Sequence, residues 1–194
     1  MRAASRRIDG ANAKDPRNEL DGGEEKPKEW LYGRRMIAWL DRLEPAASTE
    51  LRLAVRAQHL ERWRLPRSEY PEGRAGYLAW RRACAAMHAK RAGEILADEG
   101  YPASTIDRVG DLIQKRGRLR LDPESQALED VACLVFVEHY LKGFAGEHPR
   151  ERMVSVLAKT WRKMSARGRA AAADIELPTE LAALVASVAA EEGE

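Results

Sequence analysis

The sequence predicts an all-α protein that folds as a single compact helical domain of six to seven helices. The chain has 194 residues, of which 44% are hydrophobic, enough apolar material for one core. Ala, Leu, Arg and Glu are abundant, whereas Phe occurs only twice, and this balance favours helix over strand. Apolar residues recur at steps of three and four, and no strand-like alternation is long enough to indicate a sheet.

The composition along the chain suggests three parts. Residues 1–25 contain few apolar positions, so we expect a flexible N-terminal lead-in. Residues 26–175 carry the helical periodicity and form the expected domain. Residues 176–194 form an acidic C-terminal helix or tail, since six acidic and no basic residues occur from Asp174 to Glu194.

In the first half of the domain we expect helices at 27–43, 48–63, 74–99 and 104–117. Pro27 suits a first helical turn, and Ser48 is a typical N-cap residue. The stretch 64–73 contains two prolines and a glycine, so it is expected to be a loop. Gly100 is well placed to end the third of these helices.

In the second half, Asp122-Pro123-Glu124 marks a strong helix start, and the helix that follows contains seven consecutive apolar residues, Val131–Val137. Being apolar on all sides, this helix should be central, although a buried strand is an alternative for so short a run. A further helix is expected from Pro149 to Gly168, and a last one from Pro178 to Ala190.

Several classes of protein do not fit the sequence. The only cysteines, Cys84 and Cys133, are too few for a disulfide framework and fit a reducing, cytoplasmic location. No run of 18 or more apolar residues could span a membrane, and no apolar segment of a secretion signal follows the basic start.

Four titratable residues lie in the apolar stripes of four expected helices: Glu29, His59, His88 and Asp130. Moving a titratable side chain from water into the protein interior without a hydrogen-bonding partner is unfavourable by roughly several kcal/mol. We therefore expect these side chains to meet one another, a metal or a ligand. The alternative is that each is a hydrogen-bonded core residue.

The order of these helices and of the polar residues on them resembles the HD superfamily of metal-dependent phosphohydrolases. The resemblance implies an HD-like fold in which His59 and Asp130 are catalytic. It also implies that a divalent metal (Mn, Fe or Zn) is bound by His59, His88, Asp130 and Glu29. The family's His-Asp doublet is broken, because Leu60 follows His59.

Four strings resemble a second family, an uncharacterised domain of unknown function (4202). They are AQHLERW at 57–63, GYLAWRR at 76–82, QALEDVACLVF at 126–136 and KTWRKMS at 159–165. This resemblance covers roughly residues 8–175 and implies no established activity.

Arginines and aromatic residues alternate between positions 62 and 82: Arg62, Trp63, Arg64, Arg67, Tyr70, Arg74, Tyr77, Trp80, Arg81 and Arg82. Guanidinium groups bind phosphate, so Arg62 and Arg67, with His88 and Tyr77, are the expected ligand-binding residues. Alternatively, the Arg stems cover Trp faces, or the patch binds an RNA backbone.

Together these patterns predict a protein that binds, and as a further option hydrolyses, a small phosphorylated metabolite or nucleotide. Two alternatives remain open. One is a non-catalytic regulatory or interaction protein with a structural polar core, and the other is RNA binding through the Arg-rich face.

Overall fold

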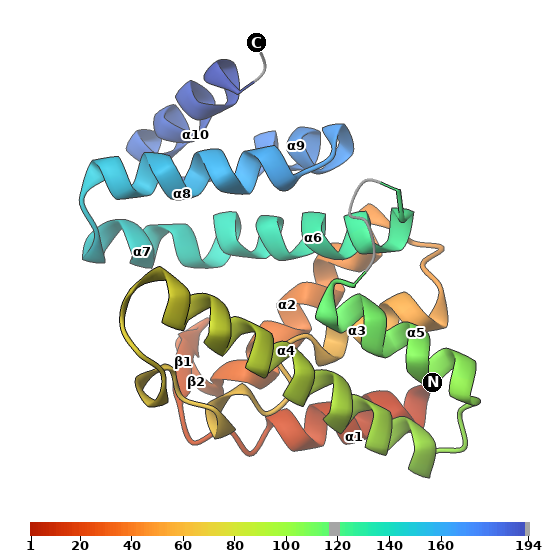
Figure 1. Ribbon diagram of the computed structural model, residues 1–194. Helices are drawn as coiled ribbons and strands as arrows, with labels where there is room; N and C mark the ends of the chain where they lie inside the picture. The colour runs from red at the N-terminus through yellow and green to blue at the C-terminus, as the bar shows by residue number, and fades with distance from the viewer. Residues whose placement is uncertain (117–120, 193–194) are drawn as a thin grey trace. The chain divides into compact units, whose positions relative to one another are not determined.

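The computed structural model describes residues 1–116 and 121–192. In these residues the chain forms ten α-helices and one pair of short antiparallel strands, which confirms the all-α prediction (Figure 1). Contacts divide the chain into two compact units, 1–125 and 126–194. No helix in the described ranges is long and apolar enough to cross a bilayer.

The first unit contains α1 (Arg2–Asn12), β1 (Asn18–Asp21), β2 (Glu24–Pro27), α2 (Lys28–Leu43), α3 (Thr49–Ala57), α4 (Gly73–Asp98) and α5 (Ala103–Gln114). Two short 3-10 turns, Arg62–Arg64 and Arg67–Glu69, lie between α3 and α4. Side chains from all five helices form the core, among them Ile8, Met36, Leu40, Leu53, Leu96 and Leu112.

Residues 1–25 differ from the expected flexible lead-in. They form α1 and then β1, which pairs with β2 in a hairpin. The buried residues of α1 are Ala4, Ile8, Ala11 and Asn12, so one narrow stripe of the helix faces the core. Such a stripe gives a weak signal in the sequence, because packing against other helices provides most of its stability.

The helix expected at 48–63 is shorter in the structure. Its start is confirmed, since the Ser48 side chain accepts a hydrogen bond from the Leu51 amide at 3.0 Å. However, α3 ends at Ala57, and a turn carries the chain to Glu61, whose φ of 54° is left-handed. A residue in that conformation cannot continue a right-handed helix. His59 therefore lies on a turn, and the prediction that it belongs to a helical stripe is wrong.

The predicted ends of the neighbouring helices agree more closely. Helix α2 begins at Lys28, with Pro27 as its N-cap, and ends at Leu43 as expected, and α4 ends just before Gly100 as expected. For α5, the structure places the C-cap at Lys115, whose φ is 55°. The expected end near Gly117 lies outside the described residues.

The second part of the chain contains α6 (Pro123–Val135), a π-helical stretch (Phe136–Tyr140), α7 (Leu141–Glu147), α8 (Arg150–Lys163), α9 (Ala166–Ala173) and α10 (Thr179–Glu191). Figure 1 shows α8 running alongside α6 and α7, with α10 on the far side of α8. The apolar run Val131–Val137 is helical as predicted, not a strand, and Leu134 within it is fully buried.

The helix expected from Pro149 to Gly168 is two helices. The first, α8, ends at Lys163, and Ser165 caps α9 by accepting a hydrogen bond from the Gly168 amide at 3.0 Å. Gly168 is thus inside a helix and does not end one. A Cβ at this position would lie 2.7 Å from Cγ of Asp130, so close packing requires glycine here.

Candidate functional site

A cluster of polar side chains lies inside the first unit. We call it the Glu29–His59 cluster, and its members are Asp15, Arg17, Glu29, His59, Arg62 and His88. Glu29 comes from the first turn of α2, His59 from the turn after α3, and His88 from α4. Segments far apart in the sequence thus supply its parts.

Glu29 is the acidic centre of the cluster and is only 3% exposed. One carboxylate oxygen accepts a hydrogen bond from Arg17 at 2.9 Å, and the other lies 3.1 Å from Nδ1 of His59. Its own amide donates to Asp15 at 3.2 Å. Burial raises the pKa of Glu29, while the positive charges of Arg62 and Arg17 oppose that rise.

The neighbours of His59 determine its protonation. Nε2 lies 2.7 Å from a guanidinium nitrogen of Arg62, which can only donate. Nε2 must therefore accept, and Nδ1 carries the proton that it donates to Glu29. Burial and, next, the charge of Arg62 hold the pKa of His59 well below its usual range. Tyr32 stacks on the ring at 3.9 Å between centroids.

Within the described ranges, Arg62 is held by a cation–π contact and a hydrogen bond and not by an ion pair, although its charge acts on Glu29 at longer range. Its guanidinium lies 4.6 Å from the centroid of the Trp80 ring and donates to His59. The Trp80 indole is itself fixed, because Nε1 donates to the Leu65 carbonyl at 2.9 Å. Within the described ranges, Arg62 forms no ion pair with a carboxylate.

His88 is 2% exposed, and one of its ring nitrogens has no hydrogen-bond partner among the described residues. Nδ1 lies 2.6 Å from the Leu60 carbonyl, so Nδ1 carries the proton and Nε2 has a free lone pair. No described atom forms a hydrogen bond with Nε2, which is unusual for a buried polar atom. Burial, followed by the nearby His59, lowers the pKa of His88 to about 3.

Asn12 fixes the turn that carries His59. Its side-chain oxygen accepts a hydrogen bond from the Glu61 amide at 2.8 Å, and its amide group donates to the Glu29 carbonyl at 3.3 Å. One buried side chain therefore joins the left-handed residue of the turn to the start of α2. Sequence reasoning missed Asn12, Asp15 and Arg17, because they lie in the segment expected to be flexible.

Asp130 lies in the second unit, where it holds the start of α9. Its Oδ1 accepts hydrogen bonds from Gln126 at 2.9 Å and from the Ser165 amide at 2.8 Å, and the Ser165 hydroxyl donates to Oδ2. A carboxylate is favourable at a helix N-terminus. These contacts give Asp130 a structural role. That Asp130 shares a pocket with His59 and His88 stays a prediction.

The other two expected ligand-binding residues lie near Arg62 in the sequence. Arg67 donates to the carbonyls of Tyr70 and Pro71, both at 2.8 Å, and so closes its own loop. Tyr77 is 43% exposed, and its hydroxyl accepts a hydrogen bond from Arg81 at 3.5 Å. A ligand-binding role for either residue stays a prediction.

The expected metal site finds no support in the geometry. Among residues 1–116 and 121–192, no group of three or more His, Cys, Asp or Glu side chains is arranged to hold a metal ion. Arg62 and Glu29 already occupy both ring nitrogens of His59. Cys84 is also buried and is a poor metal ligand. Burial raises the pKa of its thiol, whereas a metal binds the deprotonated thiolate.

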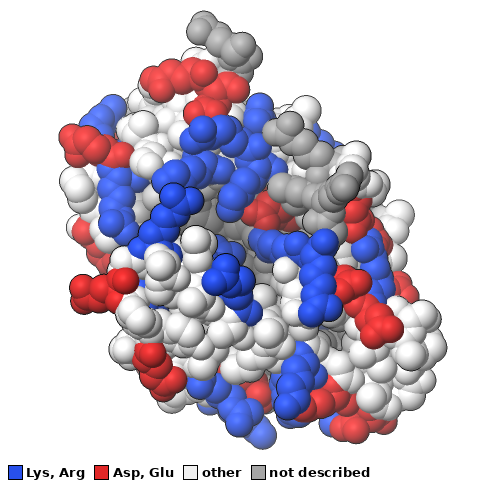
Figure 2. Space-filling view, viewed as in Figure 1, with Lys and Arg blue, Asp and Glu red and all other residues white. Residues whose placement is uncertain are grey.

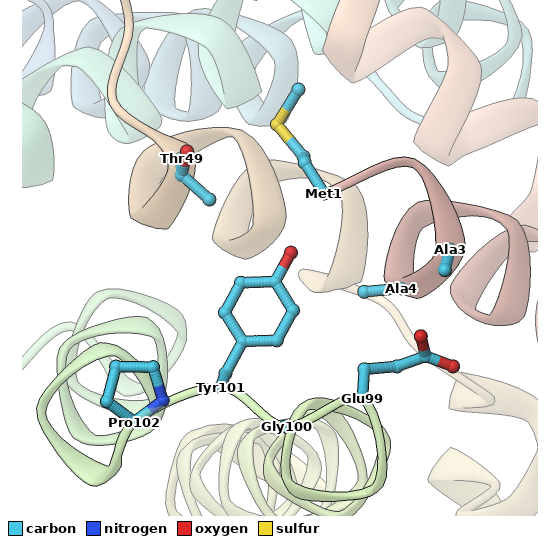
Figure 3. Close-up of a pocket in the computed structure, with 8 residues that line it drawn as sticks. All are labelled: Met1, Ala3, Ala4, Thr49, Glu99, Gly100, Tyr101 and Pro102. Atoms are coloured by element: carbon cyan, nitrogen blue, oxygen red, sulfur yellow. The ribbon is translucent and has the colours of Figure 1, made fainter.

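The first unit has two cavities that no residue of the Glu29–His59 cluster lines. One of about 440 Å³ is lined by residues including Met1, Thr49 and Tyr101, and Figure 3 shows the Tyr101 hydroxyl pointing into it. The other, of about 630 Å³, lies between α4 and α5. His59 and His88 line neither, so neither cavity is the polar pocket that the sequence predicts.

Comparison with known proteins gives one match. A family model described as a domain of unknown function (DUF4202) matches residues 2–185, and this supports the resemblance carried by the four strings. Neither the curated proteins nor the solved structures contain a match. The HD resemblance gains no support from these comparisons. Because the family match covers nearly the whole chain, the protein belongs to the DUF4202 family.

Proposed function

We propose that the first unit binds a small phosphorylated metabolite at the Glu29–His59 cluster, with the phosphate on Arg62. The observation that carries this proposal is the state of Arg62. Its guanidinium is fixed by Trp80 and His59, yet it forms no ion pair or hydrogen bond with a carboxylate in the described ranges. A pre-positioned guanidinium with donors to spare is suited to bidentate binding of phosphate.

The charge around His59 supports an anionic ligand. Four cations, Arg62, Arg81, Lys115 and Arg17, lie near enough to disfavour a positive charge on His59 and so lower its pKa. Residues 73–91 of α4 add five basic and no acidic side chains. Figure 2 shows this side of the molecule, where Lys and Arg side chains lie interspersed with Asp and Glu side chains.

His88 adds a requirement for a hydrogen-bond donor. Its Nε2 lone pair has no described partner, and an unpaired buried acceptor costs about 1–3 kcal/mol. A ligand hydroxyl, or the proton of a phosphate monoanion, would satisfy it. The proposed ligand therefore combines an anionic group with an O–H donor, as sugar phosphates and nucleotides do.

Binding is a better match for the cluster than hydrolysis. Both histidines are held neutral, and the pKa of His88 is lowered to about 3. A general base works best when its pKa lies near the working pH, so a group that protonates only near pH 3 accepts a proton poorly. The predicted catalytic roles of His59 and Asp130 therefore lie outside this proposal.

The proposal is tested by titration calorimetry with inorganic phosphate and pyrophosphate near neutral pH. Wild-type protein should bind at least one of them. The R62Q variant should lose about tenfold or more in affinity, because charge-assisted hydrogen bonds are worth about 1.5–3 kcal/mol.

The matched control is R64Q, two positions further along. Arg64 is 61% exposed and pairs with Glu61, so this variant removes one charge from the same turn and should change affinity less than about twofold. Circular dichroism should show that both variants are folded. Absence of binding by wild-type protein, or equal affinity in R62Q and wild type, would overturn the proposal.

A further inference from the structure

The outward face of α8, in the second unit, is strongly basic. We call this the α8 basic face, and its members are Arg152, Lys159, Arg162 and Lys163, all exposed. The opposite side of the helix buries Met153, Leu157 and Trp161. The only acidic residue of α8 is Glu151 in the first turn. The face therefore presents positive charge to solvent along most of the helix.

The spacing aligns these charges. Arg152 and Lys159 are seven residues apart, and Lys163 follows after four more, so all three lie on one side of a helix. At 1.5 Å per residue, the row is about 16 Å long. A row of cations of this length is complementary to a partner that carries a row of negative charges.

Little in the second unit neutralises this row. The side chains of Arg152 and Lys159 have no hydrogen-bond or ion-pair partner within the described ranges. Arg162 pairs with Glu192 at 3.3 Å, and Lys163 pairs with Glu129 at 3.2 Å. Arg162 is 58% exposed, and its surface pair with Glu192 is weak enough to exchange for a phosphate. Glu129, the partner of Lys163, is only 7% exposed, so that pair is expected to stay formed.

From these observations we propose that the α8 basic face binds the phosphate backbone of nucleic acid without regard to sequence. None of the large exposed apolar side chains of the described residues lies on α8, so the face has nothing to insert into a lipid surface. It also has no exposed aromatic ring for base stacking, so binding should depend on charge alone. This inference does not rest on the function proposed for the first unit.

The test is fluorescence anisotropy with a single-stranded RNA and a DNA duplex of about 20 nucleotides, at several salt concentrations. The double variant R152Q/K159Q should bind more weakly. The slope of log K against log salt should fall by about 1.4 for the single strand and about 1.8 for the duplex, since two phosphate contacts are lost.

A charge-matched control separates this face from overall charge. The K90Q/K142Q variant removes two exposed cations from α4 and α7 and should leave both slopes unchanged. Equal losses in the two double variants, or no binding at about 50 mM salt, would overturn the proposal. Binding to phosphatidylserine vesicles without binding to either nucleic acid would overturn it too. R62Q should bind nucleic acid normally, so failure at one site is distinguishable from failure at the other.

Discussion

At the scale of single residues, the chemistry of the cluster depends on which ring nitrogens carry protons. Arg62 can only donate, and the Leu60 carbonyl can only accept, so the two histidines have fixed tautomers. Both rings are neutral, but they differ in whether a ring nitrogen is left to bind a further group. His59 has both nitrogens engaged, whereas Nε2 of His88 has no described partner.

His88 should make the stability of the protein depend on pH. In the folded protein its pKa is lowered to about 3, whereas the unfolded chain titrates near 6.5. Between these values the unfolded chain binds more protons, so this contribution is complete above pH 6.5 and is lost as pH falls towards 3. The free energy of unfolding should drop by about 2 kcal/mol between pH 6.5 and 5 through His88 alone. Urea denaturation at the two pH values measures it.

The H88Q variant should show a smaller drop than wild type, because it removes the titrating ring and keeps an amide that can donate to Leu60. D122N is the control. Asp122 has its pKa lowered by hydrogen bonds from Arg108, so its contribution is lost only as pH falls through and below about 4. This variant should leave the change between pH 6.5 and 5 intact. An unchanged drop in H88Q would show that His88 does not cause it.

At the scale of elements, the short connections position the site more than the helices do. The turn between α3 and the 3-10 turn at Arg62–Arg64 carries His59, the Leu60 carbonyl and Glu61 within three residues. In the loop after it, Leu65 accepts a hydrogen bond from Trp80 of α4, and the carbonyl of Pro71 lies close to Gly76 in the first turn of α4. The arrangement around Arg62 therefore depends on how this loop and α4 approach each other.

Gly76 should be required for that approach. A Cβ at this position would lie 1.9 Å from the Pro71 carbonyl oxygen, which is backbone and cannot rotate away. G76A should therefore destabilise the protein by about 1–3 kcal/mol in urea denaturation, as overpacking does. The comparison is G10A, inside α1, where a Cβ would meet nothing within 4 Å. It should be neutral or stabilise by about 0.5–1 kcal/mol. Similar effects of the two variants would contradict the close contact.

At the scale of the whole molecule, the two units each contain a buried polar network. In the first unit, Glu29 joins Arg17 and His59. In the second, Asp130 joins Gln126 and Ser165. The sequence predicted a single shared pocket for these residues, whereas every hydrogen bond of Asp130 in the described ranges lies within the second unit.

Native-state hydrogen exchange of D130A should separate the two networks. Loss of three hydrogen bonds to a carboxylate should lower protection at the amides of α9 and the end of α8 by about 2 kcal/mol. Amides of α3 and α4 should exchange as in wild type. S165A, which removes only the hydroxyl donor and the cap, should affect the same amides less. An equal loss of protection around His59 and His88 would instead favour the shared pocket.

The sequence by itself determined the fold class, most helix positions and three of the four inward-facing polar residues. These follow from local rules: the Ser48 cap, the glycine after α4, and stripes that correctly predicted burial of Glu29, His88 and Asp130. Only the tertiary structure decided the rest. It ended α3 before His59, because Asn12 holds the left-handed Glu61 from a distant helix. It also paired Glu29 with His59 and Asp130 with Ser165, 30 and 35 residues apart, and no local pattern specifies such contacts.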